Sequence, residues 1–215
     1  MLTVKDNNKL DLPKQDNYER ALAIGLDIFS RKDPKWIAKK SGSLISRGGA
    51  IVVPHLNMHV LLDLETKKFT IQETGEEAPI WLSILCVHYL NSSEGRKPTG
   101  KLKHFREFKE GAFYEPAFNR RTKEILIAVF GKNPSLMVEV GKELNGKVLD
   151  SGDAAIELSY FPFMPITCVV WKGDEEFPPE ATVLFDETAE LYFSAEDMAV
   201  AAQMAVLELM RRSKR

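Results

Sequence analysis

The chain has 215 residues, of which 44% are apolar and 28% charged, and its formal net charge is −2. This composition is globular and excludes a disordered or fibrous chain. A near-neutral balance argues against nucleic acid as the main partner. The longest apolar run, residues 80–87, is far shorter than the roughly 20 residues of a membrane span. Two cysteines and no apolar secretion signal predict a cytoplasmic protein without a disulfide framework.

The N-terminal third predicts one helix followed by antiparallel strands. Apolar residues recur at helical spacing over 17–32, and Asp33 with the proline after it is a pair that ends helices. Residues 44–72 are rich in Val, Ile and Leu. They predict two or three antiparallel strands with turns near Asn57 and Lys67.

The middle of the chain predicts a central helix, a loop and two short helices. The apolar residues of 79–90 cover every side of a helical wheel, which is typical of a helix buried on all sides. Residues 91–114 mix Gly, Pro and Ser with charged and aromatic residues and predict a long ordered loop. We expect the two short helices over 115–130 and 134–145.

The C-terminal part predicts three strands and a closing amphipathic helix. The strands cover 155–161, 166–173 and 181–186, and the tight turns between them require antiparallel pairing. Ser194 and Asp197 form the cap that begins the last helix. The predicted class is α+β, with helices packed on antiparallel sheet.

The length allows one sizeable domain or two small ones. We predict a single domain over 1–215, in which 1–75 could form a helix-hairpin lobe and 76–215 the main region. Basic residues outnumber acidic ones from 97 to 147, and the reverse holds from 148 to 215. We expect these two segments to face each other in the fold.

The segment 101–121 interleaves aromatic rings with basic side chains. Such a surface can stack a flat ligand and hold its carboxylates or phosphates through arginine. The alternative is a loop whose rings fill the core while its charges stay solvated. The candidate binding residues in this segment are Phe105, Arg106, Tyr114, Arg120 and Arg121.

The stretch 169–186 places three acids and a proline pair between two apolar runs. A turn explains Asp174, which can accept backbone N–H groups, and the prolines, which stiffen the return. It does not require both Glu175 and Glu176. Asp174 and Glu175 are therefore further binding candidates, and either glutamate could act with His104 as acid and base.

Metal and nucleotide chemistry has little support in the sequence. No Gly-rich phosphate loop, H-E-x-x-H or G-x-S-x-G motif is present. His55 and His59 would stand opposite each other at the base of a hairpin, but two ligands are not a metal site. The alternative is two turn histidines. Cys86 and His88 point to different faces of the buried helix and are expected to be core residues.

Several runs in the C-terminal two thirds resemble a known family. They are FREFKEGAFYEPAFNRRT (105–122), GDAA (152–155), FPFMPITCVVWKGDEEFPPEATVLFDETAELY (161–192) and SAEDMAV (194–200). They are similar to an uncharacterised family of anaerobic bacteria and archaea that is catalogued as a domain of unknown function. The similarity extends from Trp81 to Ala201. Some relatives resemble proteins with an added iron–sulfur module like that of corrinoid proteins, but this chain lacks the cysteine run for a cluster.

The leading hypothesis is a binding or accessory protein of anaerobic one-carbon or corrinoid metabolism, a setting that the resemblance implies. Its aromatic–basic segment and acidic turn would together shape a site for an anionic, flat, tetrapyrrole-like ligand or for an iron–sulfur or corrinoid redox partner. One alternative is a small hydrolase or isomerase that uses Glu175 or Glu176 with His104. Another is a metal-binding protein built on His55 and His59.

Overall fold

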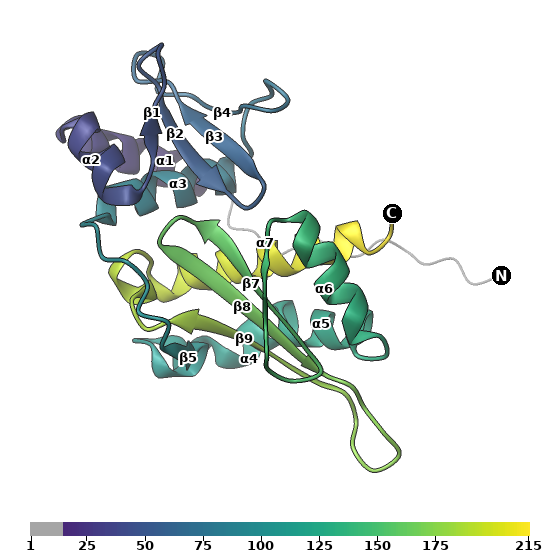
Figure 1. Ribbon diagram of the computed structural model, residues 1–215. Coiled ribbons are helices and arrows are strands. Elements are labelled where there is room, and N and C mark those ends of the chain that lie inside the picture. Colours follow the sequence, from purple (N-terminus) through teal and green to yellow (C-terminus); the bar gives the residue numbers. More distant parts are fainter. Residues whose placement is uncertain (1–14) are drawn as a thin grey trace.

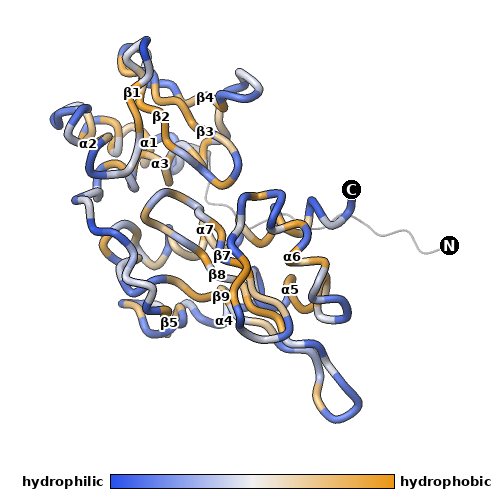
Figure 2. Tube along the Cα trace, viewed as in Figure 1, coloured by the Kyte–Doolittle hydropathy of each residue, from blue (hydrophilic) through white to orange (hydrophobic). Residues whose placement is uncertain are grey.

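Residues 15–215 are described by the computed structural model, in which helices pack against two antiparallel sheets (Figure 1). The predicted α+β class is confirmed. Apolar residues concentrate in the strands, and the loops that project from them are hydrophilic (Figure 2). Within the described residues, no helix is both long and apolar enough to cross a membrane.

The N-terminal part consists of a four-stranded sheet and three helices. Its elements are α1 (Gln15–Ser30), α2 (Pro34–Ser41), β1 (Leu44–Ile45), β2 (Ile51–His55), β3 (Met58–Leu62), β4 (Phe69–Ile71) and α3 (Ile80–Ser92). The strands pair in chain order, and the turns lie near Asn57 and Lys67 as predicted. There are four strands rather than two or three, because the two residues of β1 are too few to show an alternating pattern.

α1 ends at Ser30, three residues before Asp33, and Asp33 begins α2, a helix that the sequence analysis did not predict. Its carboxylate accepts the N–H of Lys35 at 3.0 Å and so caps α2. Pro34 occupies the first turn, where the N–H it lacks would have had no helical partner. Gly42 then ends α2 in the left-handed conformation, with φ 70°.

The C-terminal part is built on a five-stranded sheet with the order β5-β9-β8-β7-β6. Its elements are β5 (Leu102–His104), the 3-10 turn η1 (Phe105–Glu107), α4 (Gly111–Arg121), α5 (Lys123–Phe130), α6 (Pro134–Glu143), β6 (Lys147–Leu149), β7 (Ala154–Phe161), β8 (Met164–Trp171), β9 (Glu180–Asp186), the 3-10 turn η2 (Ala189–Leu191) and α7 (Ala195–Arg212). Strands β7 to β9 confirm the three predicted strands. The cap of Ser194 and Asp197 begins α7 as predicted.

Three features of this part differ from the prediction. The segment 91–114, predicted as a loop, contains β5, η1 and the start of α4. The helix predicted over 115–130 is two helices, since Thr122 is non-helical and its hydroxyl donates to the Phe118 carbonyl at 2.7 Å. Strand β6 was also missed. Strands of three residues, such as β5 and β6, are too short to show period two.

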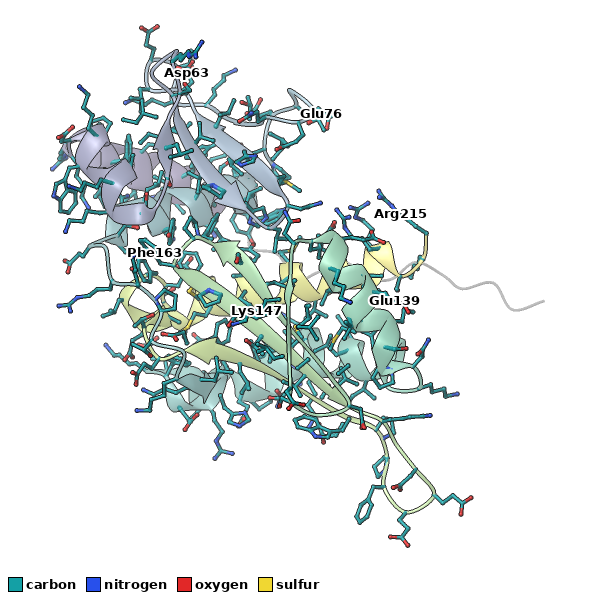
Figure 3. All side chains as sticks on the ribbon, viewed as in Figure 1. Asp63, Glu76, Glu139, Lys147, Phe163 and Arg215 are labelled. Carbon is teal, nitrogen blue, oxygen red and sulfur yellow. The ribbon has the colours of Figure 1, made fainter. Side chains whose placement is uncertain are left out.

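The buried helix α3 was predicted correctly and connects the two sheets. Side chains of α3 belong to one apolar core that includes residues of both sheets. Tyr89 of α3 stacks on Phe161 of β7 with ring centroids 4.8 Å apart. Its hydroxyl donates to the Ser41 carbonyl at 2.6 Å and accepts the N–H of Phe163 at 3.1 Å. Phe163 lies in the β7–β8 turn, below the helices of the N-terminal part in the view of Figure 3, and its ring lies close to Gly42 at the end of α2.

Candidate ligand-binding site

A pocket of about 400 Å³ lies along the outer edge of β9, and we call it the edge pocket. Its walls come from η1, α4 and the start of α5 on one side and from the β8–β9 hairpin on the other. The lining residues are His104, Phe105, Arg106, Glu115, Phe118, Asn119, Lys123, Trp171, Glu180, Ala181, Thr182 and Val183.

The floor of the pocket is formed by stacked phenylalanine rings. Phe105 and Phe118 stack in parallel with centroids 4.1 Å apart, and their centroids lie 6.3 Å and 6.1 Å from that of the Phe185 ring. The turn from η1 into α4 depends on Gly111, because a Cβ there would overlap the carbonyl oxygen of Phe105. The tight turn brings α4 back beside η1, so that Phe118 can reach Phe105.

The short strand β5 pairs with only part of β9, and residues of η1, α4 and α5 face the rest. β5 pairs with β9 only at positions 184–186, and on this side of β9 no described strand lies beside Glu180–Val183, which pair with β8 on the other side. The N–H of Glu187 points to the β5 side, where it donates to the Lys101 carbonyl at 2.8 Å. Alternate residues of an antiparallel strand direct their N–H and C=O groups to the same side. Ala181 and Val183 therefore direct theirs away from β8, toward the side of the edge pocket, although each residue is only 2% exposed.

The charges that line the edge pocket are arranged in pairs. Lys123 contacts Glu180 at 2.6 Å, and Arg106 contacts Glu115 more loosely at 3.9 Å. Burial raises the pKa of Glu180, but the hydrogen bonds from Lys123 and from the N–H of Ala181 outweigh it and lower that pKa overall. The Lys123–Glu180 pair joins the basic middle of the chain to its acidic end, which is one contact of the kind predicted for these segments.

The aromatic–basic segment is divided between the core and the surface. His104, Phe105 and Arg106 line the edge pocket, and the Nδ1 atom of His104 is 3.3 Å from the Thr182 hydroxyl. Phe105 is only 2% exposed, so its ring fills the core instead of offering a free face. The remaining candidates lie on the exposed surface of α4 and do not line the pocket; they are Tyr114, Arg120 and Arg121.

The acidic turn projects away from the body of the molecule (Figure 1) and is hydrophilic (Figure 2). Asp174 accepts the N–H groups of Glu176 at 2.8 Å and Phe177 at 2.7 Å, as predicted for a turn, and these bonds lower its pKa. Asp174, Glu175 and Glu176 do not line the edge pocket, which His104 does line. The hairpin meets the aromatic–basic segment through residues at its base instead of through these acids.

His55 and His59 do not face each other, which corrects the expected hairpin geometry. The register pairs His55 with Met58, so the two histidines occupy successive pairs and point to opposite faces. His55 is buried with Nδ1 2.8 Å from the Tyr160 carbonyl, and burial lowers its pKa to about 4. His59 pairs with Glu73 at 2.8 Å on the surface. Among the described residues, no three His, Cys, Asp or Glu side chains are grouped closely enough to hold a metal ion.

Of the two α3 residues discussed from the sequence, Cys86 lies in the core and His88 pairs with Asp197. Cys86 is fully buried, as predicted, and burial raises the pKa of its thiol. His88 is about one third exposed and lies 3.0 Å from Asp197, so it is a less buried residue than predicted. The hydrogen bond to Asp197 raises the pKa of His88. This pair lines a second cleft of about 390 Å³ between α1, α3 and η2.

Sequence reasoning missed the hairpin residues that line the edge pocket. Trp171 and Glu180 pair directly across β8 and β9 at the base of the acidic turn. Counting back from the turn residues on each strand would have identified them as neighbours. Lys123 had no comparable signal, because its position depends on the break between α4 and α5.

Comparison with known families and proteins yields one match. The model of a family described as "Domain of unknown function (DUF3786)" matches residues 33–208. No curated protein and no solved structure matches the chain. The matched region contains the edge pocket, all of the five-stranded sheet and most of the N-terminal part.

Proposed function

Since the chain belongs to this family of unknown function, we propose from the geometry that it is a binding or accessory protein whose partner occupies the edge pocket. The observation that carries the proposal is the convergence on one pocket of two regions far apart in the chain, 104–123 and 171–183. An apolar floor surrounded by a few convergent polar groups is the general form of a binding site.

The lining favours a protein partner over a flat anionic cofactor. The Phe105 and Phe118 rings are buried and stacked on each other, so Trp171, 39% exposed, and His104 are the rings left to stack a ligand. Both cations already face carboxylates, which reduces their attraction for an anion. A polypeptide carries donors, acceptors and apolar groups together and so matches this mixed lining.

The resemblance noted in the sequence supplies the setting of the proposal. Under it, the partner is an iron–sulfur or corrinoid protein of anaerobic one-carbon metabolism, and the chain assists that protein without catalysing a step itself. The absence of a cysteine run in this chain agrees with a role in which the partner carries the redox group.

Site-specific photo-cross-linking in the source cells tests the proposal. A benzoylphenylalanine at position 171 should give one discrete cross-linked product. The same residue at position 114 should not, because Tyr114 is an exposed aromatic on α4 outside the pocket. Absence of any product specific to position 171 would count against a protein partner.

The cofactor version has its own test with the purified protein. Corrinoids, haem and flavins are added in turn, and absorbance spectra and thermal melting are followed. A ligand that raises the melting temperature of the wild type but not of the Trp171→Ala variant would establish the cofactor version in place of the protein version. Arg120→Ala is the control, because Arg120 is an exposed residue of the same segment that does not line the pocket.

A further inference from the structure

We infer that the second cleft, between α1, α3 and η2, binds a small aliphatic amine. The inference is independent of the proposed function, because no residue that lines the edge pocket also lines this cleft. Its volume of about 390 Å³ lies within the range of roughly 300–1,000 Å³ that is usual for small-molecule sites. Three features of the lining define the ligand: an oriented imidazole, unbalanced negative charge and exposed aliphatic side chains.

The imidazole of His88 offers one accessible acceptor. Its Nδ1 atom lies 3.0 Å from Oδ1 of Asp197, and since a carboxylate can only accept a hydrogen bond, Nδ1 carries the proton. The other oxygen of Asp197 accepts the Ser194 hydroxyl at 3.0 Å, which holds the carboxylate in place. In the neutral ring, Nε2 is therefore an acceptor. It has no hydrogen-bond partner among the described residues and is not a buried atom, so a ligand in the cleft can reach it.

The charged groups of the cleft favour a cation. Glu190 and Asp197 contribute two carboxylates, and none of the lining residues is a lysine or an arginine. Both oxygens of Asp197 have partners, whereas the exposed carboxylate of Glu190 has none in the described part of the chain. Lys32 does not line the cleft, and its ammonium group donates to the Asn91 carbonyl. The ammonium group of a ligand would thus meet an unpaired carboxylate without a competing cation.

Exposed aliphatic side chains determine the rest of the ligand. Ile24, Ile28 and Leu191 all line the cleft and are 52%, 45% and 50% exposed. Ile24 and Ile28 are four residues apart on α1 and so lie on one face of that helix, and Leu191 comes from η2. Covering such surface with hydrocarbon removes it from water, which is favourable. The ligand should therefore combine a hydrocarbon chain with a terminal ammonium group.

The same lining disfavours other ligands of similar size. A carboxylate would be repelled by Glu190, and an alcohol would gain nothing from its charge. A protein lysine also ends in an ammonium group, but its other end is a polar backbone. That backbone would lose hydration against the aliphatic side chains without finding partners there. A free amine is the ligand that matches all three features.

Probes of one chain length with different head groups test the inference by calorimetric titration of the full chain. At about pH 9 a primary amine is still protonated, whereas an imidazole is neutral. Hexylamine should bind, n-hexanol should bind more weakly and hexanoate most weakly. From propylamine to hexylamine, the dissociation constant should fall about two- to fourfold for each added methylene. The methylamide of Nα-acetyl-lysine should bind at least about fivefold more weakly than hexylamine.

Two exposed residues of η2 allow the head group and the chain to be tested separately. Glu190→Gln removes the charge but keeps the size, and it should weaken hexylamine about threefold without affecting hexanol. Glu196→Gln is the matched control, because Glu196 is an exposed residue of α7 that does not line the cleft, and it should change the affinity by less than about 1.5-fold. Leu191→Ser should reduce the gain per methylene.

Histidine ring signals in NMR spectra locate the ligand in the wild type. Those of His88 should shift with hexylamine, whereas those of His104, which lines the edge pocket, should not. Shifts at His104 instead of His88 would overturn the inference, as would hexanoate binding as tightly as hexylamine or an unchanged affinity in Glu190→Gln. Equal binding of the lysine derivative would assign the cleft to a protein side chain and so also overturn it. The cross-link from position 171 tests the edge pocket alone, so the two proposals can fail separately.

Discussion

The hydroxyl groups of Tyr89 and Tyr160 give opposite predictions for the same chemical change. Both side chains are fully buried. The Tyr89 hydroxyl donates to the Ser41 carbonyl and accepts the Phe163 N–H, whereas the Tyr160 hydroxyl has no hydrogen-bond partner among the described residues. Replacing each by phenylalanine removes one oxygen atom and leaves the ring in place. Tyr89→Phe should destabilise the protein and Tyr160→Phe should not.

The expected sizes follow from the groups left behind. Tyr89→Phe leaves the carbonyl of fully buried Ser41 unpaired, which costs about 1–3 kcal/mol. The N–H of Phe163 is only half-buried, so water replaces part of that bond. We expect a total loss of about 2–3 kcal/mol for Tyr89→Phe. Tyr160→Phe relieves an unsatisfied buried hydroxyl and should change stability by between zero and about 1 kcal/mol in the stabilising direction.

Urea unfolding followed by far-ultraviolet circular dichroism measures both variants. The midpoint should fall for Tyr89→Phe and hold or rise for Tyr160→Phe, with an unchanged slope in both. Equal losses in the two variants would refute the reasoning, because hydrogen-bond satisfaction would then not distinguish the two hydroxyls. Since one apolar core includes residues of both sheets, both variants should also unfold in one transition. An early separate transition would instead identify residues 1–75 as an independent lobe.

Three further predictions concern local chemistry. Burial lowers the pKa of His55 to about 4 in the folded protein, whereas in the unfolded chain it is about 6.5, so the unfolded chain binds this proton first as the pH falls. The free energy of unfolding of the wild type should therefore fall by about 3 kcal/mol between pH 6.5 and 4. Urea unfolding of His55→Phe should not show this loss. Gly111→Ala places a Cβ on the carbonyl oxygen of Phe105 and should lower the free energy of unfolding by about 2–4 kcal/mol. Gly48→Ala is the control, because its Cβ meets only a serine hydroxyl at 3.9 Å, and in urea unfolding it should change this free energy by less than about 0.5 kcal/mol. Asp197→Asn should lower the pKa of His88 in an NMR titration; a pKa that stays raised would contradict the assigned role of that carboxylate.

Periodicity over long segments predicted the main elements, because burial repeats along them. The all-apolar run of α3 and the strands β7 to β9 needed no knowledge of the tertiary structure. The missed elements were short ones whose existence depends on a partner. β5 and β6 are each three residues long and extend neighbouring strands, so nothing in their own sequence marks them.

The candidate site was predicted in part, for a similar reason. His104, Phe105 and Arg106 were named from their composition, and they do line the edge pocket. The acidic turn was named because its charge exceeded what a turn requires, but charge does not report how far a turn projects from the sheet. The pocket residues at its base, Trp171 and Glu180, are set by strand register, which the sequence specifies only through the hairpin as a whole.

The aromatic composition of the segment after β5 explains why β5 ends before it pairs with Val183. If β5 continued one more residue, Phe105 would sit opposite Val183 in the sheet. Instead the chain turns at Phe105, whose ring is buried against Phe118 and near Phe185, and Gly111 allows the turn to close. Burial of these rings stabilises the core by roughly 2 kcal/mol for each side chain, more than the one or two ladder hydrogen bonds that β5 forgoes. The rings that look like a ligand-stacking surface in the sequence therefore act indirectly, because by entering the core they end β5 and form part of the lining of the edge pocket.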